Sequence, residues 1–401
     1  MIRLLVVALA FAVAAPPATL FAQSDAEALA RARRLLETHP LVDGHNDLPW
    51  EIRTQRNHPM DVEAYDLRKA TPGHTDLARL REGRVGAQFW SIYVPGEVRD
   101  SGYARIQLEE FDIARRMIAR YPELLVPAYS ADDIEKAFRE KKIGSLLGME
   151  GGHVLENSLG ALRSYYDLGA RYLTLTHNVT LDWADAASDS ARHGGLTDFG
   201  REVVREMNRL GMLVDLSHVS PATMSDALDV TRAPVIFSHS SARALTDHVR
   251  NVPDSILKRL PANGGVVMVT FVPGFISTEI MDYEEKAGEF RRGLRDVTDS
   301  TERRAKMQEW RASHPRPQAT IDDVADHIEH VRDVASIENV GIGSDFDGIT
   351  ETPVGLEDVS TFPALFAELI QRGWSDEDLA KLAGGNVIRA FRAAEAVAAR
   401  D

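Results

Sequence analysis

The sequence contains no cysteine. This absence excludes disulfide bonds, iron–sulfur clusters, cysteine-ligated zinc, a cysteine nucleophile and lipid attachment at a lipobox cysteine. A metal ion bound by this chain must therefore be held by His, Asp and Glu side chains.

The chain also lacks an excess of basic residues. It has 46 Lys and Arg against 61 Asp and Glu, which gives a formal net charge of -15. Nucleic acids and anionic membranes are bound through basic surfaces, so neither is expected as the main partner of this protein.

Long apolar runs are missing except near the N-terminus. Arg3 precedes an apolar run at residues 4–15, which is too short to span a bilayer but resembles the apolar region of an export signal. We predict a signal peptide at residues 1–22, with a buried N-terminal helix as the alternative. The mature chain is expected to be soluble and periplasmic or secreted, and the polar segment 394–401 argues against a GPI-type anchor.

Short apolar segments alternate with helical segments along the rest of the chain. The predicted strands are residues 41–45, 85–94, 143–149, 171–176, 212–216, 234–237, 265–271 and 340–342. Strands of continuous Val, Ile and Leu character indicate a parallel sheet buried on both faces. The number of units favours a single α/β domain at residues 23–401, a (β/α)8 TIM barrel. A doubly wound open sheet is the alternative, but no glycine-rich dinucleotide fingerprint follows the first strand.

One charged segment, residues 277–316, does not fit this alternation. We interpret it as a long loop insertion with a helix of its own. It either covers the active site, builds an interface, or is a solvated surface insertion.

Residues that commonly bind metals or transfer protons recur where the predicted strands end. A single His in such a place would more readily be structural, but repetition at strand after strand is improbable by chance. Barrel enzymes build their active sites at the carboxyl ends of the strands. The residues concerned are His45, Asp47, Glu150, His177, His218, His239 and Asp345.

These residues divide naturally into the ligands of two metal ions. His45 and Asp47 are predicted to bind one ion, and His218 and His239 the other. Glu150 could bridge the two ions, which leaves an open position for a shared water, as in two-metal hydrolases.

Three further roles follow from the same chemistry. Asp345 could take the proton of the attacking water and return it, as general base and then acid. His177 could donate a hydrogen bond to the developing oxyanion. Arg250, after the sixth strand, could bind a substrate carboxylate with its fork of N–H groups.

The remaining acidic and His side chains are given structural roles. Asp347 is interpreted as structural, and His153 as a supporting or loop residue. The acidic residues predicted to shape loops are Glu156, Asp182 and Asp185. The histidines predicted to lie on the surface are His193, His248, His314, His327 and His330.

Ten motifs occur in order between about residue 35 and residue 392: DGHNDLPW, GAQFWSIYVP, GMEGGH, YLTLTHN, WAD, VDLSHVS, FSHSSAR, RNVPD, GIGSDFDG and GGNVIRAF. Together they resemble those of the membrane (renal-type) dipeptidases, metallopeptidase family M19. The resemblance implies an amidohydrolase-type barrel that holds two Zn²⁺ ions and hydrolyses dipeptides, including some with a D-residue on the C-terminal side. It implies the same metal ligands, a role for Arg250 in binding the substrate carboxylate, and a role for His177 in binding the substrate and polarising its scissile carbonyl. It also implies that Asp345 transfers the proton and contacts the substrate amine.

The chain also departs from its mammalian counterparts. Mammalian members carry disulfides and a GPI anchor, which this cysteine-free sequence does not suggest, so it resembles an exported bacterial relative. Its segment 277–316 is longer than theirs, which leaves the side-chain preference open, together with β-lactam hydrolysis and assembly as a homodimer.

Three functions remain to be distinguished. The first is a zinc dipeptidase in which a hydroxide bridging the two ions attacks the peptide bond. The second is a related binuclear hydrolase of another amide, a β-lactam, a lactone or an N-acyl amino acid. Most such enzymes bridge their metals with a carbamylated Lys, and no Lys ends a predicted strand here. The third is a non-catalytic zinc-binding protein.

Overall fold

A computed structural model describes residues 17–97 and 102–400 of the chain. Most of the predicted signal peptide, residues 1–16, lies outside the described residues. Helix α1 (Pro17–Leu36) runs through the end of that prediction. Among the helices of the described ranges, none is both long enough and apolar enough to cross a membrane.

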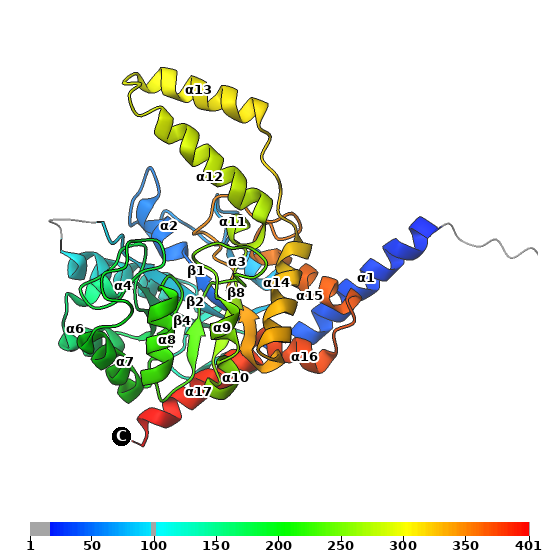
Figure 1. The fold of residues 1–401 in the computed structure, drawn as a ribbon. Helices are drawn as coiled ribbons and strands as arrows, with labels where there is room; N and C mark the ends of the chain where they lie inside the picture. The colour runs from blue at the N-terminus through cyan, green and yellow to red at the C-terminus, as the bar shows by residue number, and fades with distance from the viewer. Residues whose placement is uncertain (1–16, 98–101, 401) are drawn as a thin grey trace, which may run out of the picture.

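Eight parallel strands close into a barrel (Figure 1). Each strand pairs with the next, β2 pairs directly with β4, and β9 returns to pair with β1. The predicted (β/α)8 barrel is therefore confirmed. In barrel order the strands are β1 (Leu41–Asn46), β2 (Val85–Tyr93), β4 (Ile143–Glu150), β5 (Ala170–Thr174), β6 (Leu213–Asp215), β7 (Val235–Phe237), β8 (Val266–Val269) and β9 (Val340–Ile342).

The barrel interior is filled by side chains from several strands. Val42, Phe89, Tyr172 and Met268 are fully buried in one cluster, together with Phe391 of the last helix. A larger cluster packs the outer faces of the strands against the surrounding helices. The interior is thus a packed core, and a ligand can enter only at an end of the barrel.

Helices surround the strands, and several start at side-chain caps. Ser130, Thr197 and Ser220 each accept a hydrogen bond from a backbone N–H of the helix that follows. The helices of the outer ring are α3 (Leu77–Glu82), α4 (Tyr103–Arg120), α5 (Ala131–Arg139), α6 (Leu159–Asp167), α7 (Asp198–Leu210), α8 (Pro221–Val230), α9 (Asp254–Leu257), α10 (Leu260–Asn263), α14 (Ile321–Val334), α15 (Phe362–Gln371), α16 (Asp376–Ala380) and α17 (Asn386–Ala398).

Some short elements were not predicted. Helix α2 (Leu48–Thr54) follows the first strand directly, and it forms because Leu48 and Ile52 are buried on one face. Strand β3 (Leu125–Pro127) adds three residues to the edge of β4. Such short elements depend on the neighbours that they pack against, so a local sequence pattern does not reveal them.

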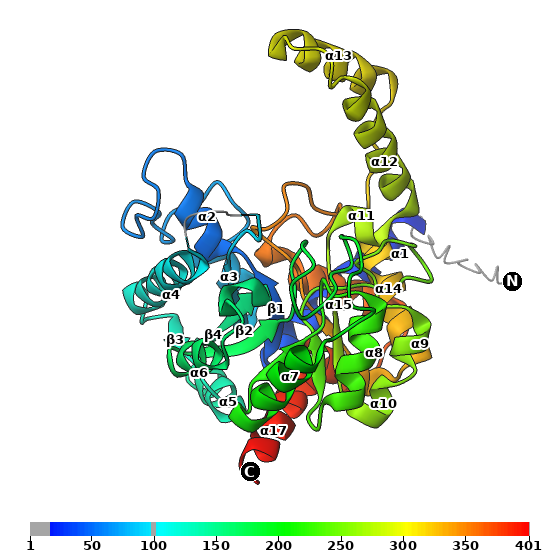
Figure 2. The same cartoon turned by 60° about the vertical axis from the view of Figure 1, so that its left-hand side comes forward.

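The charged segment 277–316, predicted to be a loop insertion with a helix of its own, contains two helices. After the short helix α11 (Pro273–Ile276), helices α12 (Thr278–Gly293) and α13 (Ser300–Ser313) form a hairpin that stands away from the barrel (Figures 1 and 2). Helix α13 buries none of its residues. Trp310 joins the two helices by ring contacts with Tyr283 and Phe290. We call residues 278–313 the arm.

Two histidines predicted to lie on the surface do not lie there. His327 is 1% exposed, and its Nδ1 accepts a hydrogen bond from the backbone N–H of Ala242. The prediction missed this because α14 is covered by the loop that follows β7. His248 is half-buried and stacks on Phe275, and both residues line a cavity of the protein.

Candidate functional site

The predicted site residues lie together at the carboxyl end of the barrel. Because parallel strands all point the same way, the residues that follow them converge at one rim. A cavity of about 660 Å³ opens there, lined by Asp47, Glu150, His177, His218, His239, Arg250 and Asp345. His45 lies beneath it, with Nε2 3.2 Å from Oδ2 of Asp47.

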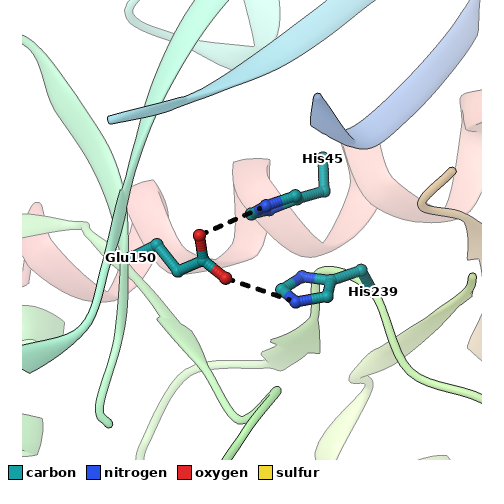
Figure 3. Close-up of side chains that lie close together, drawn as sticks. All are labelled: His45, Glu150 and His239. Carbon is teal, nitrogen blue, oxygen red and sulfur yellow. Dashed lines mark ion pairs between the residues drawn. The ribbon is translucent and has the colours of Figure 1, made fainter. Parts of the chain in front are cut away.

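Glu150 lies at the centre of this cluster. Its Oε2 is 3.5 Å from Nε2 of His45, whereas its Oε1 is 3.0 Å from Nε2 of His218 and 3.4 Å from Nε2 of His239. Figure 3 shows the two oxygens directed at different imidazoles. One carboxylate therefore directs its two oxygens at different nitrogen donors, although the rings of His45 and His239 themselves lie only 3.9 Å apart.

The outer nitrogens of the three imidazoles have hydrogen-bond partners that determine the tautomer. His45 Nδ1 lies 2.9 Å from the Tyr172 hydroxyl, and His218 Nδ1 lies 3.3 Å from Oδ1 of Asn178. His239 Nδ1 is 2.8 Å from Oγ of Ser238, which itself donates to a carboxylate, Asp215. Each partner can accept from Nδ1–H, so each Nε2 keeps its lone pair and points it toward Glu150.

These lone pairs lack donors. His45 Nε2 is buried and makes no hydrogen bond with the described residues. His218 Nε2 and His239 Nε2 are 2.9 Å apart, which brings two lone pairs together. Buried acceptors without donors are costly, and a cation removes that cost.

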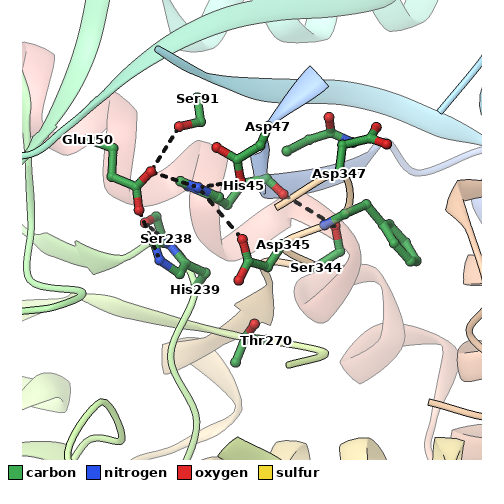
Figure 4. A network of polar contacts seen from close by, with 12 residues as sticks. His45, Asp47, Ser91, Glu150, Ser238, His239, Thr270, Ser344, Asp345 and Asp347 are labelled. Carbon is green, nitrogen blue, oxygen red and sulfur yellow. Dashed lines mark hydrogen bonds and ion pairs between the residues drawn. The ribbon is translucent and has the colours of Figure 1, made fainter. Parts of the chain in front are cut away.

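The cluster is also rich in negative charge. The carboxylates of Asp47, Glu150 and Asp345 share one space (Figure 4), with side chains 8%, 5% and 15% exposed. Burial raises the pKa of Asp345 well above its usual range, and Asp47 and Glu150 add to this increase although His45 opposes it. Burial lowers the pKa of His45, but Tyr172, Glu150 and Asp47 outweigh burial and raise it well above its usual range, so Nε2 of His45 takes up either a proton or a cation.

The donor set therefore fits metal ions. Among the described residues, three groups of three side chains each bring one ligand atom per residue within 4.8 Å of the other two. These groups are His45, Glu150 and His239; Glu150, His177 and His218; and His45, Asp47 and Asp345. Imidazole and carboxylate donors suit borderline divalent cations such as Zn²⁺. The Nδ1 contacts and a hydrogen bond from Ser91 Oγ to Glu150 Oε2 (3.1 Å) orient these ligands.

Arg250 extends the cavity away from the ligand cluster. Arg250 is 3% exposed, and this burial lowers its pKa to about 10. The Nη1 atom of Arg250 makes no hydrogen bond with the described residues. Its guanidinium carbon lies 5.2 Å from the centre of the Phe275 ring. A buried guanidinium with an unused N–H group is suited to binding an anionic group of a ligand.

His177 lies between the metal-ligand candidates and open space. Its Nε2 is 3.8 Å from Oε1 of Glu150, and its ring is 4.2 Å from that of His218. Burial lowers its pKa, so the ring is neutral near pH 7 and can donate one hydrogen bond.

Three residues of the site have backbone conformations that L-residues rarely adopt. His218, Asp345 and Asp347 have φ angles of 68°, 69° and 64°. Such left-handed residues concentrate at functional sites, where the surrounding packing holds them. Here they turn the chain sharply after β6 and β9, which directs the side chains of His218 and Asp345 into the cavity.

Residues given supporting roles from the sequence are found near the site. Asp347 lines the cavity, and its Oδ1 accepts a hydrogen bond from the backbone N–H of His74. His153 is buried against the carbonyl of Val94. Asp185 holds a loop together by accepting from backbone N–H groups of residues 192, 193 and 195.

Sequence reasoning missed several residues of the site. Asn178 and Ser238 are each next to a predicted functional His in the chain, so the sequence could have indicated that they belong to the site. Tyr172 gives no such signal, because it reaches His45 across the barrel from β5. The walls formed by Trp50, Tyr93 and other residues likewise depend on the fold.

Comparisons of the sequence with known proteins identify its family. A family profile described as membrane dipeptidase (peptidase family M19) matches residues 29–401. Dipeptidase 3 of Mus musculus is 42% identical over 380 residues, which cover 93% of this chain and 68% of the mouse protein.

Solved structures show the same fold. The probable dipeptidase PvdM of Pseudomonas aeruginosa superposes with a TM-score of 0.80 at 25% identity, covering 93% of this chain and 99% of the other. A metallopeptidase of Rhodobacter sphaeroides, solved with a phosphinate mimic of L-Ala-D-Ala, gives a TM-score of 0.75 at 24% identity, covering 89% and 99%. The profile match over nearly the whole chain and the mouse relative establish that this protein belongs to the membrane dipeptidase family M19 and is a metal-dependent dipeptidase.

Proposed function

We propose that this enzyme is a zinc dipeptidase with two Zn²⁺ ions per chain. His45 and Asp47 would hold one ion, His218 and His239 would hold the other, and Glu150 would supply one oxygen to each. The observation that carries this proposal is the division of the Glu150 oxygens, with Oε2 facing His45 and Oε1 facing His218 and His239.

The other residues of the cavity are given the roles that the family resemblance implies, and their positions are compatible with them. When bound, the zinc ions would lower the pKa of a water molecule in the site and polarise the scissile carbonyl. Asp345 accepts the proton of the water and donates it to the leaving amine. His177 donates a hydrogen bond to the carbonyl oxygen as charge develops on it. Arg250 holds the substrate carboxylate, and Asp345 also contacts the substrate amine.

A substrate panel tests this function. Metal-loaded protein is assayed with L,L-, L,D- and D,D-dipeptides and with N-acyl amino acids, together with measurement of zinc per chain. We expect hydrolysis of free dipeptides, including some with a D-residue on the C-terminal side, and about two zinc ions per chain. Hydrolysis of N-acyl amino acids without hydrolysis of dipeptides would contradict the proposal.

The assignment of His45 to one ion predicts an unequal loss of metal. His45→Ala should lower the occupancy of the ion bound by His45 and Asp47 more than that of the other, because His218 and His239 remain in place. Metal analysis across a zinc titration measures both occupancies. Exposed His314, changed to Ala, serves as the control and should retain both ions. Equal loss of both ions in His45→Ala would show that they do not bind separately.

The carboxylate contact of Arg250 predicts an effect on substrate binding. Arg250→Gln should raise KM by about tenfold to a hundredfold, because a charge-assisted pair in a buried site is lost. Arg250→Lys should lie between Gln and the wild type, since Lys keeps the charge without the fork. Steady-state kinetics on a dipeptide and on its C-terminal amide form the comparison. The amide has no carboxylate, so an equal loss on both substrates would refute this role.

We also propose that the chain is exported and that residues 1–22 are removed as a signal peptide. The short apolar run after Arg3 supports this assignment. The mature enzyme would then act on dipeptides in the periplasm or outside the cell.

A further inference from the structure

A second cavity lies directly beside the active-site cavity. It measures about 780 Å³, and the two share Val272, Gly348 and Ile349 as walls. A Cβ atom on Gly348 would lie 2.2 Å from Oδ2 of Asp47 and 2.6 Å from Oδ1 of Asp345. The shared wall therefore stands against the carboxylates of the site, and a group bound near them can extend into the second cavity.

The arm forms the far side of this second cavity. Tyr283, Glu284 and Arg291 of α12 line it, together with Arg311 of α13. Just beyond the arm, Arg316 forms ion pairs with Glu284 and with Glu351 of the loop after β9. These ion pairs join the base of the arm to the rim of the active site.

Unpaired positive charge collects on the same side. Arg291 and Arg311 are exposed and form no ion pair within residues 17–97 and 102–400. Arg291 also lines a third cavity, of about 460 Å³, in which Arg292, Arg295, Arg303 and Arg304 gather. In that part of the arm too, the described residues provide no acidic partner for these arginines.

The acidic residues of the arm lie elsewhere. Apart from Glu284, which is paired with Arg316, no acidic side chain of the arm lines either cavity in the described structure. Arginines of the arm thus line both cavities, and Arg291 is common to the two. This local charge is opposite in sign to the net charge of -15 of the whole chain.

We propose that the second cavity is a side-chain subsite that selects dipeptides with an acidic side chain. This inference rests on the proposed dipeptidase function. Arg291 and Arg311 bind the side-chain carboxylate while Arg250 holds the C-terminal carboxylate. Clefts lined by one sign of charge concentrate ligands of the opposite sign, so the outer arginines add to the rate of capture.

The test compares substrates that differ only in charge. Glu-Ala is paired with Gln-Ala, and Ala-Glu with Ala-Gln, and kcat/KM is measured for each. At least one Glu dipeptide should exceed its Gln partner by about tenfold, the value of one charge-assisted contact. The preference should shrink as salt is raised, because screening at about 0.15 M acts over about 8 Å.

Two double variants locate the preference on the arm. In Arg291→Gln/Arg311→Gln the Glu-to-Gln ratio should fall toward one. In Arg291→Glu/Arg311→Glu a Lys dipeptide should become better than its Gln partner. The control is Arg115→Gln/Arg205→Gln, which removes the same charge from exposed positions on α4 and α7 and should keep the wild-type ratio.

Each outcome supports or overturns the proposal. Equal rates for Glu and Gln dipeptides in an active wild-type enzyme would overturn the acidic subsite and leave the dipeptidase function intact. An equal loss of preference in the α4 and α7 control would also overturn it, because net charge alone would then account for the preference. Failure to hydrolyse any dipeptide would instead contradict the proposed function.

Discussion

Replacing Asp345 by Asn is expected to lower kcat by about 10²- to 10⁴-fold while both metal ions stay bound. Asn has nearly the same size as Asp, but it cannot accept the proton of the attacking water or return it to the leaving amine. The carboxylate is well placed for both steps, since its Oδ1 is 3.9 Å from His45 Nε2 at the edge of the ligand cluster. Steady-state kinetics and zinc analysis on the same preparation measure the two effects together.

A neighbouring residue provides the control for this prediction. Asp347 lies two residues further along the same turn, has a similar φ angle and also lines the cavity. Asp347→Asn should change kcat far less, because the Asn side chain can still accept the hydrogen bond from His74. Full activity of Asp345→Asn would refute its role in proton transfer. Loss of one zinc ion in that variant would show that Asp345 is a metal ligand.

Replacing Glu150 by Gln is expected to remove metal from both positions and to lower activity by more than about 10³-fold. The variant keeps the size of the side chain but loses the charge that both groups of imidazoles face. An amide offers one oxygen where the carboxylate offers two, so it cannot bridge two ions. Zinc analysis after dialysis and kinetics with added zinc measure the effect, and a chelator applied to the wild type should produce the same inactive state.

The chain offers a matched buried Glu as the control. The side chain of Glu110 on α4 is 0% exposed and accepts a hydrogen bond from Arg53, and the residue does not line the active-site cavity. Glu110→Gln should retain both zinc ions and activity. If Glu150→Gln also retained both ions, the bridging assignment would be wrong, and each ion would need a complete ligand set elsewhere in the cluster.

The sequence by itself determined the architecture and the candidate residues that meet at the carboxyl end of the barrel. A strand and its end are encoded locally, by a run of apolar residues followed by polar ones. For that reason Leu41–Asn46 and the other strands were located within a few residues, and the residues that follow them were found without the fold. The composition alone limited the possible metal ligands to His, Asp and Glu, because the chain contains no cysteine.

Only the tertiary structure decided how these residues support one another. Pairing of β9 with β1 closes the barrel and brings Asp345 next to His45, although the two are 300 positions apart in the chain. Tyr172 sets the tautomer of His45 from across the barrel, a contact that no local pattern encodes. The position of the arm also depends on tertiary contacts. The sequence shows that this segment is rich in charge, but only the packing of the arm determines which of its arginines lie beside the active site. Local sequence patterns fix strands and donors, whereas contacts between distant segments fix their geometry.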